Sequence, residues 1–173
     1  AVANRLQRDS VMWRTLPNTY EVWWETDADG LLNRLLREHQ TWWNLDRRAS
    51  AQALGLSIRE ATVLASIVQA ETADLSEAPM VAGLYLNRLK KGMALQADPT
   101  LIYALNDPSI RRVLDVHKNV DSPYNTYRHK GLPPGPIRYV DPRYILSVLS
   151  PAQHNHLYMC AEPEATGKHR FAS

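Results

Sequence analysis

The sequence predicts an α+β domain, with helices concentrated in its first half and short strands nearer its end. Leucines recur at helical spacing after Asp27. Ser57 and Glu60 form a capping box in front of a second apolar helical stretch. Extended candidate segments and proline-rich turns gather in the second half. A run of helices followed by strands is typical of an α+β domain.

Three long helices are expected first. The first runs from Asp27 to residues 42–43, because its apolar residues recur at three- and four-residue spacing. The second starts at Ser57, whose hydroxyl can cap a helix while Glu60 reaches back to it. The third begins around residues 76–79 and ends at Gly92, a residue that suits a helix C-terminus.

Three aspartates precede prolines and predict short helices. Asp98, Asp107 and Asp141 each place a potential N-cap before a proline suited to the first helical turn. The expected helices cover residues 100–105, 109–114 and 143–149.

The sheet is expected to be small and mainly antiparallel. Residues 131–136 contain three prolines and cannot form a helix or a central strand, so we expect a shaped loop beside a cleft. A further short extended run is expected at residues 21–24. The remaining extended candidates are residues 94–97, 124–129, 157–160 and 170–172.

Size and composition limit the classes of protein. A chain of 173 residues with 45% hydrophobic and 22% charged residues fits one globular domain, and the sequence has no membrane-length apolar stretch. Residues 1–15 show little pattern and are interpreted as a connection to an upstream region, with the domain proper at 16–173. The net charge of +2 and the short basic runs favour solvated helix faces over a nucleic-acid surface.

The remaining special residues favour packing over chemistry. Cys160 lies in an apolar stretch and is expected to be a buried, inert thiol. Core packing is the expected role of the paired tryptophans at 23–24 and 42–43, rather than sugar stacking. His154 and His156 lack a third ligand at suitable spacing, so no metal is expected.

Glu71 is the most informative residue. It follows Leu64, Ile67 and Val68 at helical spacing and so shares their apolar stripe. Burial there raises the pKa of a carboxyl group, as a general acid requires. Two alternatives stay open at this point: Glu71 reaches water near the helix end, or it pairs with an arginine such as Arg88.

Several ordered blocks resemble the YceG-like family of endolytic lytic transglycosylases. The resemblance covers roughly residues 17–171, nearly the whole domain. The blocks are residues 64–72 (LASIVQAET), 81–89 (VAGLYLNRL), 92–100 (GMALQADPT), 124–127 (YNTY), 131–137 (GLPPGPI) and the pair Leu157-Tyr158.

The resemblance implies an enzyme of the bacterial cell wall. Such enzymes cleave the bond between N-acetylmuramic acid and N-acetylglucosamine in nascent glycan strands and leave 1,6-anhydromuramoyl ends. The family's catalytic glutamate precedes a threonine, which selects Glu71. One carboxyl group acts first as acid and then as base, and no cofactor is implied.

The resemblance also implies a setting for the domain. An N-terminal membrane helix and a LysM-like region precede the catalytic part in this family. We therefore expect a single-pass inner-membrane protein whose catalytic domain faces the periplasm or cell exterior. Glycan strands are the expected partner, and peptidoglycan synthases are candidate partners.

Two positions depart from the family pattern. Gln69 stands where another glutamate is common, which leaves Glu71 as the only carboxylate in its block. Asn18 stands where the family often has aspartate, which puts a charge role there in doubt.

The other blocks are expected to build the substrate cleft. The amides of Asn87, Gln96 and Asn125 suit N-acetyl and hydroxyl groups. Arg88 is expected to meet a substrate carboxylate or to pair with Glu71. For Asp98, a helix-capping role is weighed against a second catalytic carboxylate. The remaining expected substrate contacts are Thr100, Tyr124, Thr126 and Tyr127.

Two other functions stay open. One is a hydrolytic muramidase that uses Glu71 with Asp98 or Asp121, since glycoside hydrolysis ordinarily needs two carboxylates. The other is a catalytically silent glycan-binding domain of the cell-wall machinery.

Overall fold

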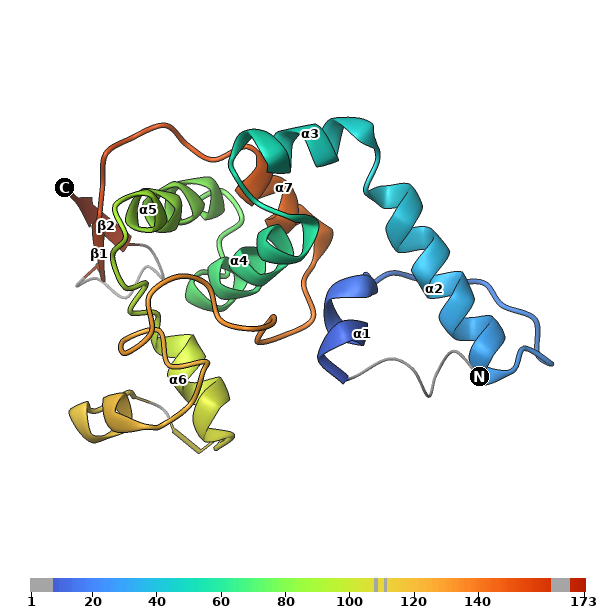
Figure 1. The fold of residues 1–173 in the computed structure, drawn as a ribbon, viewed down its shortest axis with the longest axis horizontal. Helices are drawn as coiled ribbons and strands as arrows, with labels where there is room; N and C mark the ends of the chain where they lie inside the picture. Colours follow the sequence, from blue (N-terminus) through green and yellow to red (C-terminus); the bar gives the residue numbers. More distant parts are fainter. Residues whose placement is uncertain (1–7, 108, 111, 163–168) are drawn as a thin grey trace.

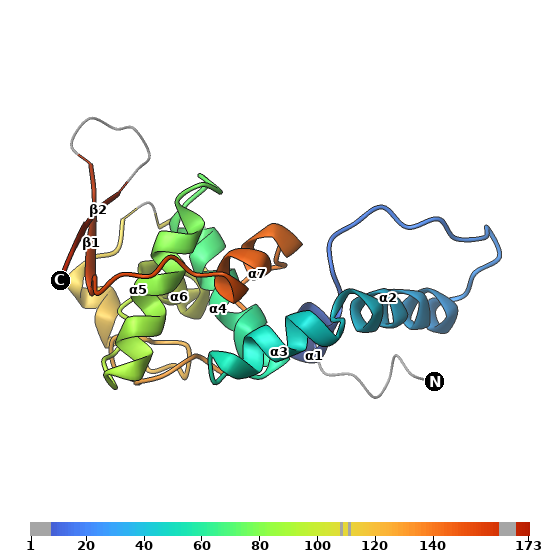
Figure 2. The same ribbon diagram turned by 90° about the horizontal axis from the view of Figure 1, so that it is seen from above.

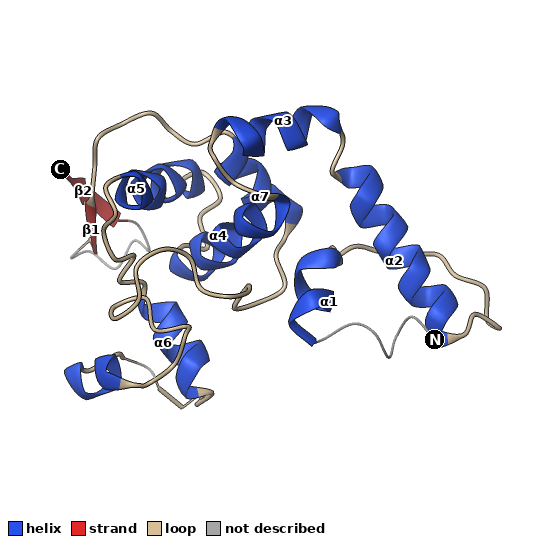
Figure 3. Cartoon of the chain, viewed as in Figure 1, coloured by secondary structure: helices blue, strands red, loops and turns tan. Residues whose placement is uncertain are grey.

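The structure is a computed structural model that describes residues 8–107, 109–110, 112–162 and 169–173. Within these ranges the chain forms α-helices, one 3-10 helix and one two-stranded antiparallel sheet, which confirms the expected α+β class (Figures 1 and 3). The elements are α1 (Arg8–Arg14), α2 (Ala28–Trp42), α3 (Leu45–Ala53), α4 (Ile58–Glu71), α5 (Ala78–Lys90), α6 (Asp98–Leu105), η2 (Asp115–Asn119), α7 (Pro142–Leu149), β1 (Tyr158–Ala161) and β2 (His169–Ala172).

Helix α4 is the centre of the fold. It packs against α5, α6 and α7 (Figure 1). Every residue from 61 to 68 is buried. A helix that is covered all round belongs in the core rather than at the surface. Its start is fixed as the sequence predicted: Ser57 Oγ accepts from the backbone N–H of Glu60, and the Glu60 carboxylate accepts from the N–H of Ser57.

The N-terminal region differs from the expectation. Residues 8–14, predicted to have little pattern, form helix α1, which packs against α2 and α4. Helix α2 begins after Asp27 as predicted and extends away from the α4–α5–α7 cluster (Figure 2). Residues 21–24 form no strand, so that prediction is wrong.

The tryptophan pairs divide between core and surface. The Trp43 side chain is 1% exposed and packs in the core, with Trp42 against it. Trp23 and Trp24 are 85% and 99% exposed, so core packing was the wrong prediction for this pair. They lie in the irregular segment between α1 and α2, where residues 21–25 are all exposed.

Helix α3 was missed in the sequence. The expected first helix ends at Trp42, and a new helix follows at Leu45. Its N-cap is Asn44, whose side chain accepts from the N–H of Arg47 at 3.0 Å. Because the cap follows the end of α2 so closely, no run of loop-forming residues separates the two helices in the sequence.

The aspartate–proline pairs gave mixed outcomes. Asp141 caps α7 as predicted, accepting from the N–H of Arg143 at 2.9 Å. Asp98 is not an N-cap: Ala97 holds that position, and Asp98 lies inside the first turn of α6. The described residues of 109–114 are not helical; Asp107 instead accepts from both the N–H and the hydroxyl of Ser109.

The strands lie only at the end of the described chain. The expected strands at 157–160 and 170–172 are found as β1 and β2, with Met159 opposite Phe171. Residues 94–97 and 124–129 are irregular or turn structure, so those two strand predictions are wrong. Residues 131–136 form the expected loop, and Arg59 donates to the carbonyl of Pro134.

The β-hairpin and the segment before it are fastened to α5. Asn87 Nδ2 donates to the carbonyls of His154 and His156, at 2.7 and 3.2 Å. Gly83 permits this close approach, because a Cβ there would lie 2.5 Å from the carbonyl oxygen of Ala152. The segment before β1 therefore lies against α5, and residues of β1 and β2 line the same pocket as Glu71 at the end of α4.

None of the described helices alone has both the length and the apolar character needed to cross a membrane; α3 and α4 meet that test only as a pair, across a 77° bend.

Candidate active site

Glu71 is the last residue of α4 and faces the neighbouring helix α5. The hydroxyl of Tyr85 on α5 donates to Glu71 Oε1 at 2.5 Å. Tyr85 is 2% exposed. The alternative of an ion pair with Arg88 is not what the structure shows, because Arg88 donates elsewhere.

The buried Arg88 guanidinium binds backbone carbonyls. Its Nε donates to Leu157 O at 2.6 Å, and its Nη1 donates to Leu95 O at 2.6 Å. Among the described residues it forms no carboxylate ion pair; its charge also lies over the ring of Tyr158, at 5.5 Å. Arg88 thus joins the hairpin to α5 and leaves a positive charge near Glu71.

The surroundings of Glu71 favour its protonated form. Burial raises the pKa of the Glu71 carboxyl to about 7, from an ordinary value of 4.5. The hydrogen bond from Tyr85 acts in the opposite direction, the negative charge of Asp98 adds to the rise, and His169 and Arg88 reduce it. A carboxyl group with this pKa is suited to general acid catalysis near neutral pH.

Glu71 opens onto a pocket of about 280 Å³ between α4, α5, the start of α6 and the hairpin. Four other residues predicted from the sequence line the same pocket: Arg88, Gln96, Asp98 and Tyr127. Its full lining is Glu71, Leu84, Tyr85, Arg88, Leu95, Gln96, Asp98, Tyr127, Met159, Cys160, Ala161 and His169.

Asp98 and Tyr127 form a polar pair at this pocket. The hydroxyl of Tyr127 donates to Asp98 Oδ1. Burial, together with the adjacent Asp98 carboxylate, raises the pKa of Tyr127 well above its ordinary value, so the phenol stays neutral. The carboxylate of Asp98 therefore accepts a hydrogen bond at the pocket and does not cap a helix.

Gln96 adopts an unusual backbone conformation at the pocket wall. Its φ is +51°, a left-handed value that non-glycine residues seldom adopt. The conformation is held by a hydrogen bond from Gln96 N–H to Thr126 O at 3.0 Å. Such conformations tend to occur at functional sites.

Five predicted substrate contacts do not line this pocket. Asn87 Nδ2 binds the segment before the hairpin, as described above. Asn125 and Thr126 are buried: Asn125 donates to Lys118 O and Val120 O, and Thr126 Oγ1 accepts from Ala97 N–H and lies 2.8 Å from Thr100 Oγ1. The Tyr124 ring packs on Tyr103, with centroids 4.8 Å apart. These residues support the walls around Gln96 and Tyr127.

Two further expectations about the cleft are corrected. Residues 131–134 line a different pocket, together with Leu56, Arg59 and Lys90, so the proline-rich loop is not a wall of the Glu71 pocket. Cys160 is exposed on β1 rather than buried, and it lines the Glu71 pocket.

Tyr85, Glu77 and His169 were not among the site residues predicted from the sequence. Tyr85 lies one helical turn before Arg88, so helix periodicity offered a signal that both face the same side of α5. Glu77 and His169 are joined by hydrogen bonds across 92 positions of the chain, and no local pattern links them.

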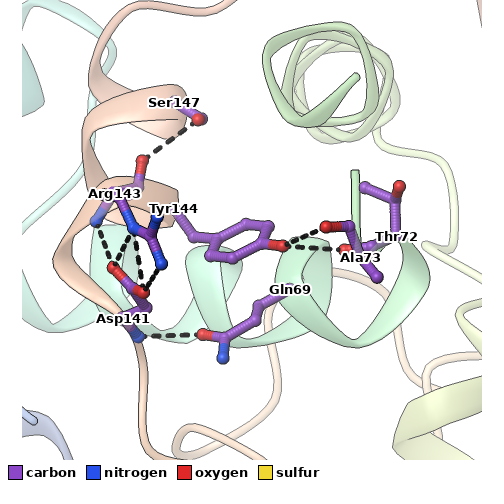
Figure 4. Close-up of polar contacts among 7 residues, drawn as sticks. All are labelled: Gln69, Thr72, Ala73, Asp141, Arg143, Tyr144 and Ser147. Atoms are coloured by element: carbon purple, nitrogen blue, oxygen red, sulfur yellow. Dashed lines mark hydrogen bonds and ion pairs between the residues drawn. The ribbon is translucent and has the colours of Figure 1, made fainter. Parts of the chain in front are cut away.

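The end of α4 is held from the other side by α7 (Figure 4). Tyr144 donates from its hydroxyl to Thr72 O at 3.1 Å and to Ala73 O at 3.3 Å. The N–H of Asp141 donates to Gln69 Oε1 at 2.9 Å. Gln69 is thus a structural contact to the start of α7, and this region contacts the chain on both sides of Glu71.

Potential metal ligands do not cluster: across the part of the chain that the structure describes, His, Cys, Asp and Glu side chains form no group of three or more suited to an ion.

Comparison with known proteins gives this geometry a context. The model of the YceG-like family matches residues 4–173. The chain belongs to the YceG-like family. The resemblance seen in the sequence blocks is therefore confirmed.

YceG-like relatives include named enzymes and a solved structure. A Bacillus subtilis protein named endolytic murein transglycosylase is 36% identical over 107 residues, 62% of this chain and 29% of its own length. A Streptococcus pneumoniae protein of the same name is 29% identical over 151 residues, 84% of this chain and 27% of its own. The crystal structure of a YceG-like protein from Listeria monocytogenes superposes with a TM-score of 0.82 and 29% identity, covering 99% of this chain and 55% of the other.

The chain therefore spans less than a third of the length of these named enzymes and about half of the Listeria chain. The match to the solved structure confirms the α+β fold over nearly all of the chain.

Proposed function

We propose that this domain is an endolytic peptidoglycan lytic transglycosylase. It would cleave the bond between N-acetylmuramic acid and N-acetylglucosamine and leave a 1,6-anhydromuramoyl end. The observation that carries the proposal is the placement of Glu71: its half-buried side chain lines a pocket, and one carboxyl oxygen is held by the buried Tyr85 hydroxyl. Burial in this setting raises the pKa of the Glu71 carboxyl to about 7. The names of the Bacillus and Streptococcus relatives support the same reaction.

The proposed reaction uses Glu71 twice. Because Oε1 accepts the Tyr85 hydrogen bond, Oε2 is left to carry the proton toward the glycosidic oxygen. As that bond breaks, the oxygen takes the proton and positive charge develops at the muramic acid C1. The Glu71 carboxylate then removes the proton from the C6 hydroxyl of the same sugar, whose oxygen bonds to C1. The glutamic acid is regenerated and no water is consumed.

The reaction is aided by the intramolecular attack, since a nucleophile on the same sugar needs no additional translational ordering. It is also aided by the charge of Arg88 near the transient Glu71 carboxylate. Gln96 and Tyr127 are the proposed contacts to the sugars, because both line the pocket and carry hydrogen-bonding groups.

The hydrolytic alternative requires a second carboxylate that can activate water. Asp98 is at the pocket but accepts the hydrogen bond of Tyr127. The Asp121 side chain is 96% exposed and does not line the pocket. Of the two candidates, Asp98 is therefore the one that lies where a muramidase would need its second carboxylate.

The setting of the domain is part of the proposal. Peptidoglycan lies outside the cytoplasmic membrane, so the domain would face the periplasm or the cell exterior. Anchoring by an upstream membrane helix and association with peptidoglycan synthases are further parts of this proposal.

The test is product analysis with purified glycan strands. The unaltered chain should release fragments that lack the mass of one water at their muramoyl end. Glu71→Gln should abolish release while the fold is retained, and Glu25→Gln, on the exposed loop before α2, is the matched control. Reducing muramic acid ends would support the muramidase instead. Binding without any cleavage by the unaltered chain would support the silent glycan-binding domain.

A further inference from the structure

The first residue of β2 brings an imidazole to the Glu71 pocket. His169 lies opposite Ala161 in the hairpin, and its side chain is 15% exposed. His169 lines the same pocket as Glu71. It comes from the C-terminal strand, whereas Glu71 ends the central helix.

Glu77 holds His169 in place through two separate contacts. The backbone N–H of His169 donates to Glu77 Oε1 at 2.7 Å, and its ring Nδ1 lies 2.8 Å from Glu77 Oε2. Glu77 is itself 8% exposed, directly before α5. A carboxylate that binds both the backbone and the ring fixes the strand position and the ring orientation together.

These contacts also determine which ring nitrogen carries hydrogen. Burial acts to raise the pKa of Glu77, but the hydrogen bonds from the ring and backbone of His169 and from Thr72, together with the charge of His169, bring the pKa below its ordinary value. Glu77 is therefore an acceptor, and Nδ1 must donate to it. The atom that the ring offers to a ligand is then Nε2, as in other carboxylate–histidine pairs.

We propose that His169 is a substrate-binding residue whose Nε2 binds a hydroxyl group of the saccharide that lies over Glu71, with Glu77 holding the ring for this contact. The inference rests on the proposed function, because it assigns a partner to the sugar within the same pocket. A hydroxyl can donate to a neutral imidazole and accept from a charged one, so the contact suits either state.

A purely structural role is the competing explanation. In that case the Glu77–His169 pair only fastens the hairpin to the start of α5. The backbone N–H already makes one of the two bonds, and it is kept when His169 is replaced by asparagine or glutamine. The two roles therefore depend on different atoms of the imidazole, Nδ1 for fastening and Nε2 for the substrate.

Two substitutions remove the contacts of these two atoms one at a time. In His169→Asn the amide can replace Nδ1 in donating to Glu77, but nothing replaces Nε2. In His169→Gln the longer amide can reach the Nε2 position, but the bond to Glu77 is lost. His129→Asn, on an exposed turn, is the matched control. Thermal unfolding of each variant reports whether the fold is kept.

The measurements are cleavage of glycan strands and binding of a GlcNAc–MurNAc tetrasaccharide, the latter in a Glu71→Gln background. His169→Asn should unfold at the same temperature as the parent, yet lose about tenfold in tetrasaccharide affinity and in kcat/KM, as expected for one lost hydrogen bond. His169→Gln should recover part of that affinity despite lower stability.

The inference is overturned if His169→Asn binds and cleaves like the parent. It is also overturned if the substitutions at position 169 change the unfolding temperature but leave tetrasaccharide affinity and kcat/KM unchanged. Failure of the proposed function gives a different result: the parent chain then releases no anhydro ends. In that event the tetrasaccharide still tests His169, since a tenfold loss of binding supports the contact and unchanged or undetectable binding overturns it.

Discussion

Tyr85 on α5 donates a 2.5 Å hydrogen bond to Glu71 at the end of α4, and Tyr85 is almost fully buried. The bond joins α4 and α5, which both contribute residues to the pocket. It fixes one carboxyl oxygen of Glu71 and leaves the other for the substrate. Burial raises the pKa of Tyr85 well above its ordinary value, so it donates and does not titrate near neutral pH.

Removing this bond should alter both rate and pH dependence. In Tyr85→Phe, Glu71 loses a hydrogen bond that lowers its pKa, so the pKa should rise further. The basic limb of the pH–rate profile should then move to higher pH, and kcat should fall about tenfold because the carboxyl group is no longer oriented. Tyr139→Phe, at a half-exposed ring, is the control. An unmoved basic limb would argue against the assigned role of Tyr85.

The stability of the chain should depend on the protonation of Glu71. Between its ordinary value of 4.5 and about 7, the folded chain holds a proton that the unfolded chain has released. The free energy of unfolding should therefore fall as pH rises through this window, by up to about 1.4 kcal/mol for each pH unit. Glu71→Gln should remove this slope in urea titrations across pH 4 to 8, whereas parallel curves for the two chains would contradict it.

Gly83 should not tolerate a side chain. A Cβ at this position would lie 2.5 Å from Ala152 O and 2.7 Å from His154 Nε2, so the segment before β1 would have to move. We expect Gly83→Ala to lower the free energy of unfolding by about 1–3 kcal/mol, as overpacking does. Chemical denaturation measures this. Gly92→Ala is a useful comparison, because its cost would come from the positive φ of +63° and not from contact.

Tyr144 should stabilise the segment after Glu71. Its hydroxyl donates to Thr72 O and Ala73 O (Figure 4). Tyr144→Phe should cost about 1 kcal/mol of stability and leave the Tyr85–Glu71 bond intact. Activity per folded molecule should then change less than twofold. A loss as large as that of Glu71→Gln would mean that Tyr144 acts in the chemistry itself.

Local signals in the sequence predicted much of the core. The capping box at Ser57 and Glu60 fixed the start of α4, and helical spacing placed Glu71 among buried neighbours. The Asp141 cap was likewise predicted, because each of these features depends on residues within one helical turn. The same local rule misplaced Asp98, since its carboxylate accepts from Tyr127 rather than capping α6.

The partners of Glu71 could not be predicted in the same way. Tyr85 reaches it from another helix, and His169 reaches Glu77 from 92 positions away. Predicted polar residues such as Asn125 and Thr126 proved to be buried supports, because a polar side chain in a matched block serves equally well to hold a loop or to bind a sugar. Only the packing of α4, α5 and the hairpin decides which of them face the pocket.

The proposed reaction depends on a carboxyl group of Glu71 that keeps its proton near neutral pH. A carbon-13 NMR titration of the glutamate side-chain carboxyls measures this directly, with the Glu71 signal assigned from its loss in Glu71→Gln. We expect a titration midpoint near pH 7, from the burial of the group. A midpoint near the ordinary value of 4.5 would contradict the account, because Glu71 would then be ionised when it should act as an acid.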